Sequence, residues 1–296
     1  MARYIDPKTD FGFKRLFAQE ESKDILKQFL FDVLKLAYPI QELTYIPNEQ
    51  LPQTADERIG VYDVYCTDLV GNRFIVEIQR GYQTFIRDRV LYYSTFPIVH
   101  QAKKGTTWQF ELLPIHCIVI LNFTIDAGME YLRRIQLMDT QAKTVFYDKL
   151  TYVYIELPKF GKQASELTDA ADRWVYLLKN MPELQDIPAE LANEPFTHAF
   201  EIAKEAALSP QERLLYEASL KSARDAYAEI MSARQKGLEE GRQEGLEEGR
   251  QEGRQEGRQE EKLATARTMR ALGMATAVIA QVTGLATEEI EQLASS

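Results

Sequence analysis

Two acidic residues, Asp63 and Glu77, lie within the stretch RIGVYDVYCTDLVGNRFIVEIQR, which runs from Arg58 to Arg80. Two runs rich in β-branched and aromatic residues flank a short break, Leu69-Val70-Gly71, and this pattern predicts a β-hairpin. Gly71 suits the left-handed position that closes a three-residue hairpin loop. A loop of this length places Asp63 directly opposite Glu77.

Two facing carboxylates are unfavourable in a purely structural hairpin. Opposed residues have Cβ atoms about 4.5–5.5 Å apart, and like charges at that spacing destabilise the pair. Burial among Val, Ile, Tyr and Phe adds a desolvation cost. A divalent cation removes both problems, because Mg²⁺ binds carboxylate oxygens together with waters and phosphates. Gln79 points from the same face as Glu77 and can orient a water. The alternative is a solvent-facing strand surface on which two acids happen to meet.

Several sequence blocks extend this motif. Asp63, thirteen intervening residues and then Glu77-Ile78-Gln79 resemble the PD-(D/E)XK nuclease pattern with Gln in place of Lys. Further blocks follow in order along about residues 4–260: FGFKRLF, VEIQR, RDRVLYY, ILNF, ELPKF, DRWVYLLK and a glycine-glutamate repeat. The chain therefore resembles the PD-(D/E)XK nuclease family transposases, also called the Rpn family of recombination-promoting nucleases. The ordered set of blocks, more than the acidic motif, makes the resemblance specific.

This resemblance implies an α/β protein with a restriction-endonuclease-like αβββαβ core, a mixed sheet and a helical C-terminal extension. It implies a DNA endonuclease that uses Mg²⁺ or Mn²⁺, hydrolyses phosphodiester bonds and is associated with transposition or recombination. Asp63 and Glu77 would hold the metal, and Gln79 would act with them in catalysis. The alternative is a catalytically weak or inactive nuclease fold that serves as a DNA- or partner-binding module.

The segment that follows the hairpin, Tyr82–Lys104, has a helical pattern. Arg89 and Tyr93 are four residues apart and share one face of this helix. Nucleases of the superfamily contribute polar residues from the corresponding helix, so the resemblance implies Arg89 and Tyr93 as further catalytic residues. Arg87, and Lys14 in the block FGFKRLF, are candidate substrate-binding cations. In the alternative interpretation, the tyrosines pack on the sheet and the cations are solvated.

Composition excludes several classes of protein. The chain has 296 residues, of which 45% are hydrophobic and 27% charged, as in ordinary globular proteins. No run approaches the roughly 20 apolar residues that cross a membrane, and the first residues lack a signal-peptide core. We therefore expect a cytoplasmic protein without membrane contact. Cys66 and Cys117 lie in apolar runs and predict buried thiols, and the three histidines show no zinc-ligand spacing. The net charge of −10 argues against a generally basic DNA-binding surface.

Hydrophobic periodicity predicts the remaining core elements. We expect two helices within residues 8–36, with Asp10 capping the first turn and a second start after Ser22. A nearly continuous apolar run predicts a strand that is buried on both faces. The other expected elements are two strands, an amphipathic segment and a helix. In chain order, these elements are Leu43–Ile46, the buried strand Leu112–Phe123, the amphipathic segment Met129–Leu137, Leu150–Leu157 and the helix 166–180.

The C-terminal part has a different composition. We expect a nuclease-like domain at 1–205, a helical connector at 206–236, a Gly-Glu-Arg repeat at 237–261 and a small helical tail at 262–296. Glycine recurs every fourth residue from Gly237 to Gly257, and each helical glycine costs about 1 kcal/mol relative to alanine. Two hypotheses stay open. The repeats of two chains pack through their glycines as a homodimer, or the repeat is a polar linker.

Overall fold

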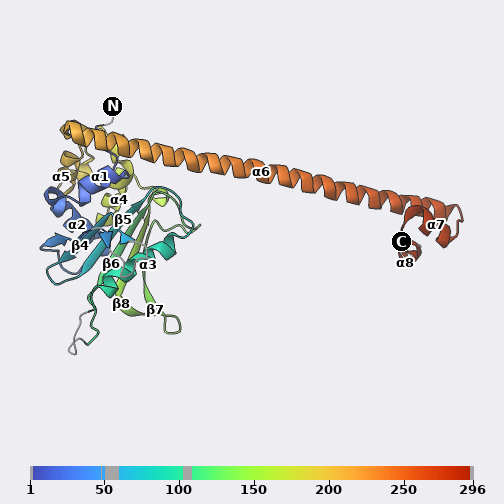
Figure 1. Cartoon of the computed structure of the whole chain (residues 1–296), viewed down its shortest axis with the longest axis horizontal. Coiled ribbons are helices and arrows are strands. Elements are labelled where there is room, and N and C mark those ends of the chain that lie inside the picture. The colour runs from blue at the N-terminus through green and yellow to red at the C-terminus, as the bar shows by residue number, and fades with distance from the viewer. Residues whose placement is uncertain (1–2, 48, 51–59, 103–108, 294–296) are drawn as a thin grey trace. The chain divides into compact units, whose positions relative to one another are not determined.

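The computed structural model describes residues 3–47, 49–50, 60–102 and 109–293 (Figure 1). Two of the predicted boundaries, Arg58 at the start of the hairpin and Lys104 at the end of the helix, lie outside the described residues. The chain divides into two compact units, Met1–Tyr227 and Ala228–Ser296.

The first unit contains a mixed six-stranded sheet with the strand order β1-β4-β5-β6-β8-β7. Strands β5, β6 and β8 run parallel to one another, and the other neighbouring pairs are antiparallel. The strands are β1 (Leu43–Tyr45), β4 (Val64–Asp68), β5 (Arg73–Gln79), β6 (Ile115–Leu121), β7 (Leu132–Asp139) and β8 (Thr144–Glu156). Two further short strands, β2 (Glu49–Gln50) and β3 (Gly60–Val61), form a separate ladder.

The β4–β5 hairpin has the predicted register. Val64 pairs with Val76, so the next pair outward, Asp63 and Glu77, lies just beyond the end of the ladder. Gly71 has a φ of +93°, which confirms the predicted left-handed position in the loop. The alternation of apolar side chains and the three-residue loop together fix the register, because a slip of one residue would reverse both faces of the strand.

The two faces of the sheet support separate cores, as Figure 1 shows by the helices on either side. Phe74, Val76 and Ile78 belong to the larger core, whereas Ile75 belongs to the smaller core, which α3 covers. The larger core packs against α1 (Asp10–Phe17), α2 (Lys23–Leu34), α4 (Ala170–Asn180) and α5 (Phe196–Ile202), and the smaller packs against α3 (Ile86–Val99). The expected α/β fold with a mixed sheet is confirmed.

Most expected elements are present, with some differences. Helix α3 begins at Ile86 and not at Tyr82, and α4 begins at Ala170 and not at residue 166. The first turn of α1 is capped by Thr9, whose Oγ1 accepts a hydrogen bond from the Gly12 amide at 3.0 Å, and not by Asp10. The amphipathic segment Met129–Leu137 overlaps the edge strand β7. Short 3₁₀ helices connect the elements: η1 (Glu20–Ser22), η2 (Leu157–Lys159), η3 (Ala164–Glu166), η4 (Met181–Glu183), η5 (Ala189–Leu191) and η6 (Glu205–Ala207).

The two cysteines are buried free thiols, as predicted. Cys66 lies in the larger core and Cys117 in the smaller core. Burial raises the pKa of both thiols well above the usual value. Both side chains therefore act as apolar packing groups in the folded protein.

Helix α6 (Pro210–Ala271) begins with proline in its first turn, where a missing N–H costs nothing. Ser209 and Glu212 exchange hydrogen bonds at this end, at 3.3 and 2.8 Å. The helix continues through the whole glycine repeat, and every residue from 228 to 262 is exposed. This part of α6 therefore buries no side chains against the described chain.

Two short helices, α7 (Thr276–Thr283) and α8 (Thr287–Gln292), complete the second unit. They form a small apolar cluster with the end of α6. Positive φ values at Gly273 and Gly284, +78° and +69°, mark the two breaks between these helices. In the part of the chain that the structure describes, no helix combines the length and apolar character that crossing a bilayer would require.

Candidate active site

The open end of the β4–β5 hairpin holds Asp63 and Glu77 against each other. The Asp63 amide donates a hydrogen bond to Glu77 Oε1 at 3.3 Å. The Ile78 amide in turn donates to Asp63 Oδ2 at 2.7 Å. The Glu77 side chain is buried, with 5% of its surface exposed, and Asp63 is partly buried. The structure thus brings together both predicted metal ligands at the C-terminal end of β5.

Both carboxyl groups have raised pKa values. Burial is the main cause at Glu77, and together with the nearby Asp63 it raises the pKa of Glu77 to about 8, against the opposing charge of Arg89. Burial also raises the pKa of Asp63, while the hydrogen bond from Ile78 opposes this shift. The pair therefore carries fewer than two negative charges at neutral pH in the metal-free protein.

This donor set fits Mg²⁺. The ion commonly binds proteins through one or two carboxylates and completes its shell with waters and phosphate oxygens. A cation between Asp63 and Glu77 would stabilise their charged forms and so oppose the burial that raises both pKa values. Within residues 3–47, 49–50, 60–102 and 109–293, no group of three or more Asp, Glu, His or Cys side chains is arranged to hold a metal. This holds at the Asp63–Glu77 site too. The protein would thus supply two carboxylates and leave the other positions to water and substrate.

A chain of amide groups connects Glu77 to helix α3. Gln79 Nε2 donates to Glu77 Oε2 at 3.2 Å, and Gln79 Oε1 accepts from Gln83 Nε2 at 2.8 Å. Gln83 Oε1 then accepts from Arg89 Nη1 at 3.2 Å. The Arg89 guanidinium lies 5.0 Å from the centre of the Tyr93 ring. Gln79, Arg89 and Tyr93 are therefore parts of one connected arrangement beside the acids.

Tyr93 contributes more than its ring. Its backbone carbonyl lacks the usual helical donor, because residue 97 is proline. The Tyr62 hydroxyl donates to this carbonyl at 2.8 Å, and the two tyrosine rings pack edge to face at 5.6 Å. This contact fixes α3 directly to the residue that precedes Asp63.

The two candidate cations lie in different places. Lys14 pairs with Asp10 at 2.8 Å on α1, and the two charges act in opposite directions on the pKa of Asp63. Lys14 is therefore close enough to influence the acidic pair. Arg87 lies slightly more than half a helical turn from Arg89 on α3 and pairs with Asp126 at 2.9 Å. The structure does not bring Arg87 to Asp63 and Glu77.

Sequence reasoning missed two residues of this arrangement, Gln83 and Asp10. Gln83 falls within the predicted helix Tyr82–Lys104, but α3 begins only at Ile86, so Gln83 lies in the connection between β5 and α3. Asp10 had a usable signal, because it stands four residues before Lys14 and the two can form an ion pair on one helix face.

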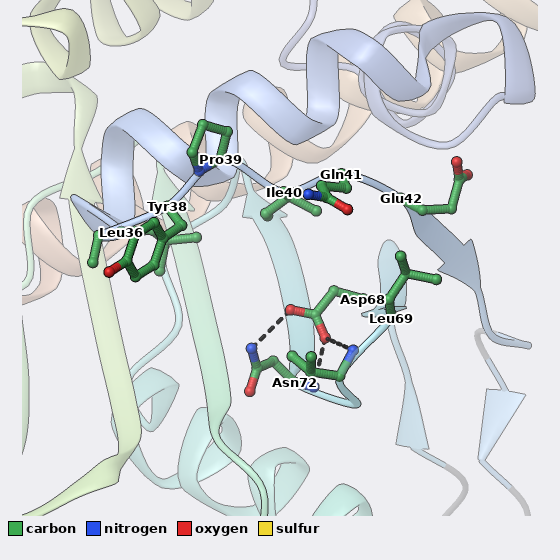
Figure 2. A pocket seen from close by; sticks show the side chains of 11 residues that line it. Leu36, Tyr38, Pro39, Ile40, Gln41, Glu42, Asp68, Leu69 and Asn72 are labelled. Atoms are coloured by element: carbon green, nitrogen blue, oxygen red, sulfur yellow. Dashed lines mark hydrogen bonds between the residues drawn. The ribbon is translucent and has the colours of Figure 1, made fainter.

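A separate cavity of about 460 Å³ lies between the connection 36–42 and the hairpin loop (Figure 2). Figure 2 shows Asp68 bonded to Asn72, and its carboxylate accepts from the Asn72 side chain at 2.7 Å and from the Asn72 amide at 2.8 Å. These bonds hold the loop at the end of the hairpin opposite Asp63 and Glu77. We therefore assign this cavity no part in the candidate active site.

Comparisons with known proteins give one match. A family model described as PD-(D/E)XK nuclease family transposase matches residues 7–233 of the chain. Neither the curated proteins nor the solved structures gave a match to the chain. The matched range contains every candidate site residue and ends before the glycine repeat begins at Gly237.

Proposed function

The chain belongs to the PD-(D/E)XK nuclease family transposases, and from this premise we propose that it is a Mg²⁺-dependent DNA endonuclease with Asp63 and Glu77 at its active site. The observation that carries the proposal is the buried Glu77 carboxyl, whose pKa is raised to about 8 beside Asp63. A buried pair of acids is costly for stability. The cost is understandable if the pair binds a metal for phosphodiester hydrolysis in transposition or recombination.

Each nearby side chain has a proposed role. Asp63 and Glu77 would hold the cation, which supplies an activated water and stabilises charge on the phosphate in the transition state. The Gln79 amide group donates a hydrogen bond to the Glu77 carboxylate. From this position Gln79 would orient a water bound to the cation. Arg89 provides the positive charge that Gln79 lacks, since its charge lowers the pKa of both acids. Lys14 would bind a phosphate on the α1 side of Asp63.

One observation favours the alternative of a DNA-binding module with weak or no activity. Both ends of the Gln79 amide are occupied, one by Glu77 and the other by Gln83. Gln79 keeps one N–H and one carbonyl lone pair for a water, but it lacks the positive charge that the usual lysine brings. The two functions differ in one observable, the metal-dependent cleavage of DNA.

The experiment is nicking of supercoiled plasmid by the full chain, with Mg²⁺ and with EDTA. We expect the wild type to nick only with metal, and Asp63→Ala to lose this activity because one of two ligands is gone. Asp186→Ala is the control, because Asp186 is also an acid but its side chain is 90% exposed. Cleavage by Asp63→Ala at the wild-type rate would show that the site is wrongly assigned. DNA binding without any cleavage by the wild type would favour the binding module.

We also propose that the glycine repeat pairs with a second copy of the chain. The repeat is helical although its six glycines together cost roughly 6 kcal/mol relative to alanine. Its residues are exposed, so no packing within the described chain offsets this cost. A partner helix would do so, because small residues at every fourth position permit close approach of two backbones.

A further inference from the structure

Helix α3 covers one face of the sheet. Arg89 lies on the flank of this helix that faces the candidate active site, and Arg87 lines a groove on the other flank, which we call the second groove. Along the same row of the sheet, Glu77 neighbours Val119, Val119 neighbours Tyr154, and Tyr154 neighbours Arg133. Adjacent strands are about 4.8 Å apart, so the backbone of Tyr154 lies only two strand spacings, roughly 10 Å, from that of Glu77. The second groove therefore opens close to the acids on the same face.

A cavity of about 270 Å³ fills this second groove. Its walls combine two tyrosines, three aliphatic side chains and two arginines. These residues are Arg87, Leu91, Ile125, Arg133, Ile135, Tyr152 and Tyr154. Leu91 and Ile135 remain 55% and 44% exposed, although both are large and apolar. An apolar aromatic cavity bordered by cations suits a flat, uncharged ring that is joined to an anionic group.

The two guanidinium groups are held side by side. Arg87 and Arg133 both bond to Asp126 Oδ2, at 2.9 and 2.6 Å. Lys159 joins the same carboxylate at 3.1 Å, and the buried Glu156 contacts Arg133 and Lys159. The cluster thus contains three cations and two carboxylates, which leaves one positive charge in excess.

Arg133 also has an unused donor. Its Nε–H is buried and has no acceptor among the residues that the structure describes. A guanidinium has five N–H donors, and one bond from Arg87 to a protein side chain is described, that to Asp126. Arg87 therefore has further N–H groups that can donate to a ligand. The positive charges of both arginines act on the hydroxyl of Tyr154, where they oppose the rise of its pKa to about 12 that burial causes. Charge and ring surface therefore meet at one point of the cavity.

We propose that this groove binds one unpaired base of the DNA, with the adjoining phosphate on Arg87 and Arg133. The proposal rests on the proposed function and adds the class of substrate. The cavity is smaller than the pockets of about 300–1,000 Å³ that hold drug-sized ligands, so it suits a single base. A base inside a duplex is stacked and paired and cannot enter such a cavity without leaving the helix. The preferred substrate is therefore single-stranded DNA, or DNA with an unpaired base beside the cleaved bond.

The test measures binding by the full chain in EDTA, so that no cleavage interferes. The probe is a short oligonucleotide that contains the fluorescent base 2-aminopurine, either alone or annealed to its complement. We expect tighter binding of the single strand and a change of fluorescence as the base enters the groove. Equal affinity for both forms with unchanged fluorescence in the wild type would overturn the proposal, and would be the result if the groove serves a protein side chain instead.

Matched variants locate the base. Ile135→Trp fills the groove, whereas Val145→Trp adds the same ring at a similarly exposed position, 50% against 44%, outside it. We expect Ile135→Trp to weaken single-strand binding at least fivefold, the lower end of base–aromatic stacking, and Val145→Trp to leave it unchanged. Arg87→Gln should weaken binding and reduce the salt dependence by about one ion. Lys35→Gln should do neither, because Lys35 is an exposed cation that follows α2 on the other face of the sheet. If the two tryptophan variants have equal effects, and the two glutamine variants also have equal effects, the proposed base binding in the groove is refuted.

Failure of this proposal differs from failure of the nuclease assignment. If single strands bind and Ile135→Trp weakens binding, but plasmid is never nicked with Mg²⁺, base binding in the groove is supported and the nuclease function is refuted. If nicking depends on Asp63 while Ile135→Trp and Val145→Trp bind and cleave alike, the nuclease function is supported and base binding in the groove is refuted.

Discussion

Glu77 gives the metal-free protein a stability that depends on pH. Its pKa is about 8 in the folded state and 4.5 in the reference state. Between these values the folded protein binds more protons than the unfolded chain, so stability falls as pH rises from about 4.5 through 8. Glu77→Gln removes the ionisable group. In EDTA above pH 8, we expect the free energy of unfolding of the variant to be roughly 1–3 kcal/mol higher than that of the wild type. Near pH 5 the two free energies should be similar.

Urea unfolding at the two pH values checks this expectation, with the exposed Glu130→Gln as control. Added Mg²⁺ should narrow the difference at high pH, since bound metal stabilises only the protein that retains the carboxylate. A Glu77→Gln variant with the same pH dependence as the wild type would show that Glu77 titrates normally.

Gln79 tests whether the missing lysine limits activity. Gln79→Lys places a cation beside Glu77, and we expect the nicking rate to be kept or raised, because lysine is the usual residue at this position of the motif. Gln79→Met has a similar length without hydrogen bonds and should lower the rate. Plasmid nicking of the three proteins at equal concentration decides the matter. If Gln79→Lys fails to fold, the side chain belongs to a packed interior and its proposed catalytic role must be abandoned.

At the scale of single residues, the sequence predicts those positions whose neighbours lie in the same regular element. The alternation of β5 and the glycine of the loop place Asp63 beside Glu77, and helical spacing places Arg89 near Tyr93. The sequence cannot tell which flank of α3 faces β5, so Arg87 and Arg89 look equivalent until the helix is docked. The helical pattern from Tyr82 also gives no sign that the chain stays irregular until Ile86, so the position of Gln83 is not predicted.

Helix α3 depends on a hydrogen bond from outside the helix. Pro97 removes the donor for the Tyr93 carbonyl, and the buried Tyr62 hydroxyl replaces it. Tyr62→Phe should therefore cost roughly 1–3 kcal/mol, the penalty of a buried acceptor without a partner. In a Pro97→Ala background the restored N–H supplies the bond, and the same Tyr62→Phe change should cost clearly less.

A double-mutant cycle of urea unfolding measures this coupling. The two costs should differ by at least 0.5 kcal/mol, the usual lower limit for residues that interact. Equal costs in both backgrounds would mean that the Tyr62 hydroxyl contributes nothing specific to α3.

At the scale of elements, buried strands are predictable and edge strands are less so. The continuous apolar run of β6 and the alternation of β8 mark strands that lie between neighbours. Strand β7 forms the edge of the sheet, carries Arg133 and Arg134, and is largely exposed, so its sequence has no clear period of two. Antiparallel pairing with the next strand, β8, determines its structure.

The glycine repeat determines how copies of the whole molecule associate. Replacing Gly241, Gly245, Gly249 and Gly253 with alanine should raise helix stability by about 1 kcal/mol per site. A Cβ atom at any of these positions meets nothing within 4 Å in the single chain. The four methyl groups would, however, separate two helices that pack through their glycines. We therefore expect the alanine variant to gain helix content and lose dimer.

Sedimentation at matched concentrations compares this variant with the wild type. The control replaces Gln243, Gln251, Gln255 and Gln259 with alanine on the same helix, which leaves the glycine stripe intact. An unchanged dimer fraction in the glycine variant, or no dimer in any of the proteins, would support a linker and refute the pairing.

The two buried thiols have a consequence for the whole folded unit. A thiol reagent reacts with the thiolate, and neither Cys66 nor Cys117 can present one to solvent until its side of the sheet opens. Cys66 lies beneath α1, α2, α4 and α5, whereas Cys117 lies beneath α3. Their labelling rates in the native protein thus report separately on the two helical layers, and a DNA strand bound along α3 would slow the reaction of Cys117 more than that of Cys66.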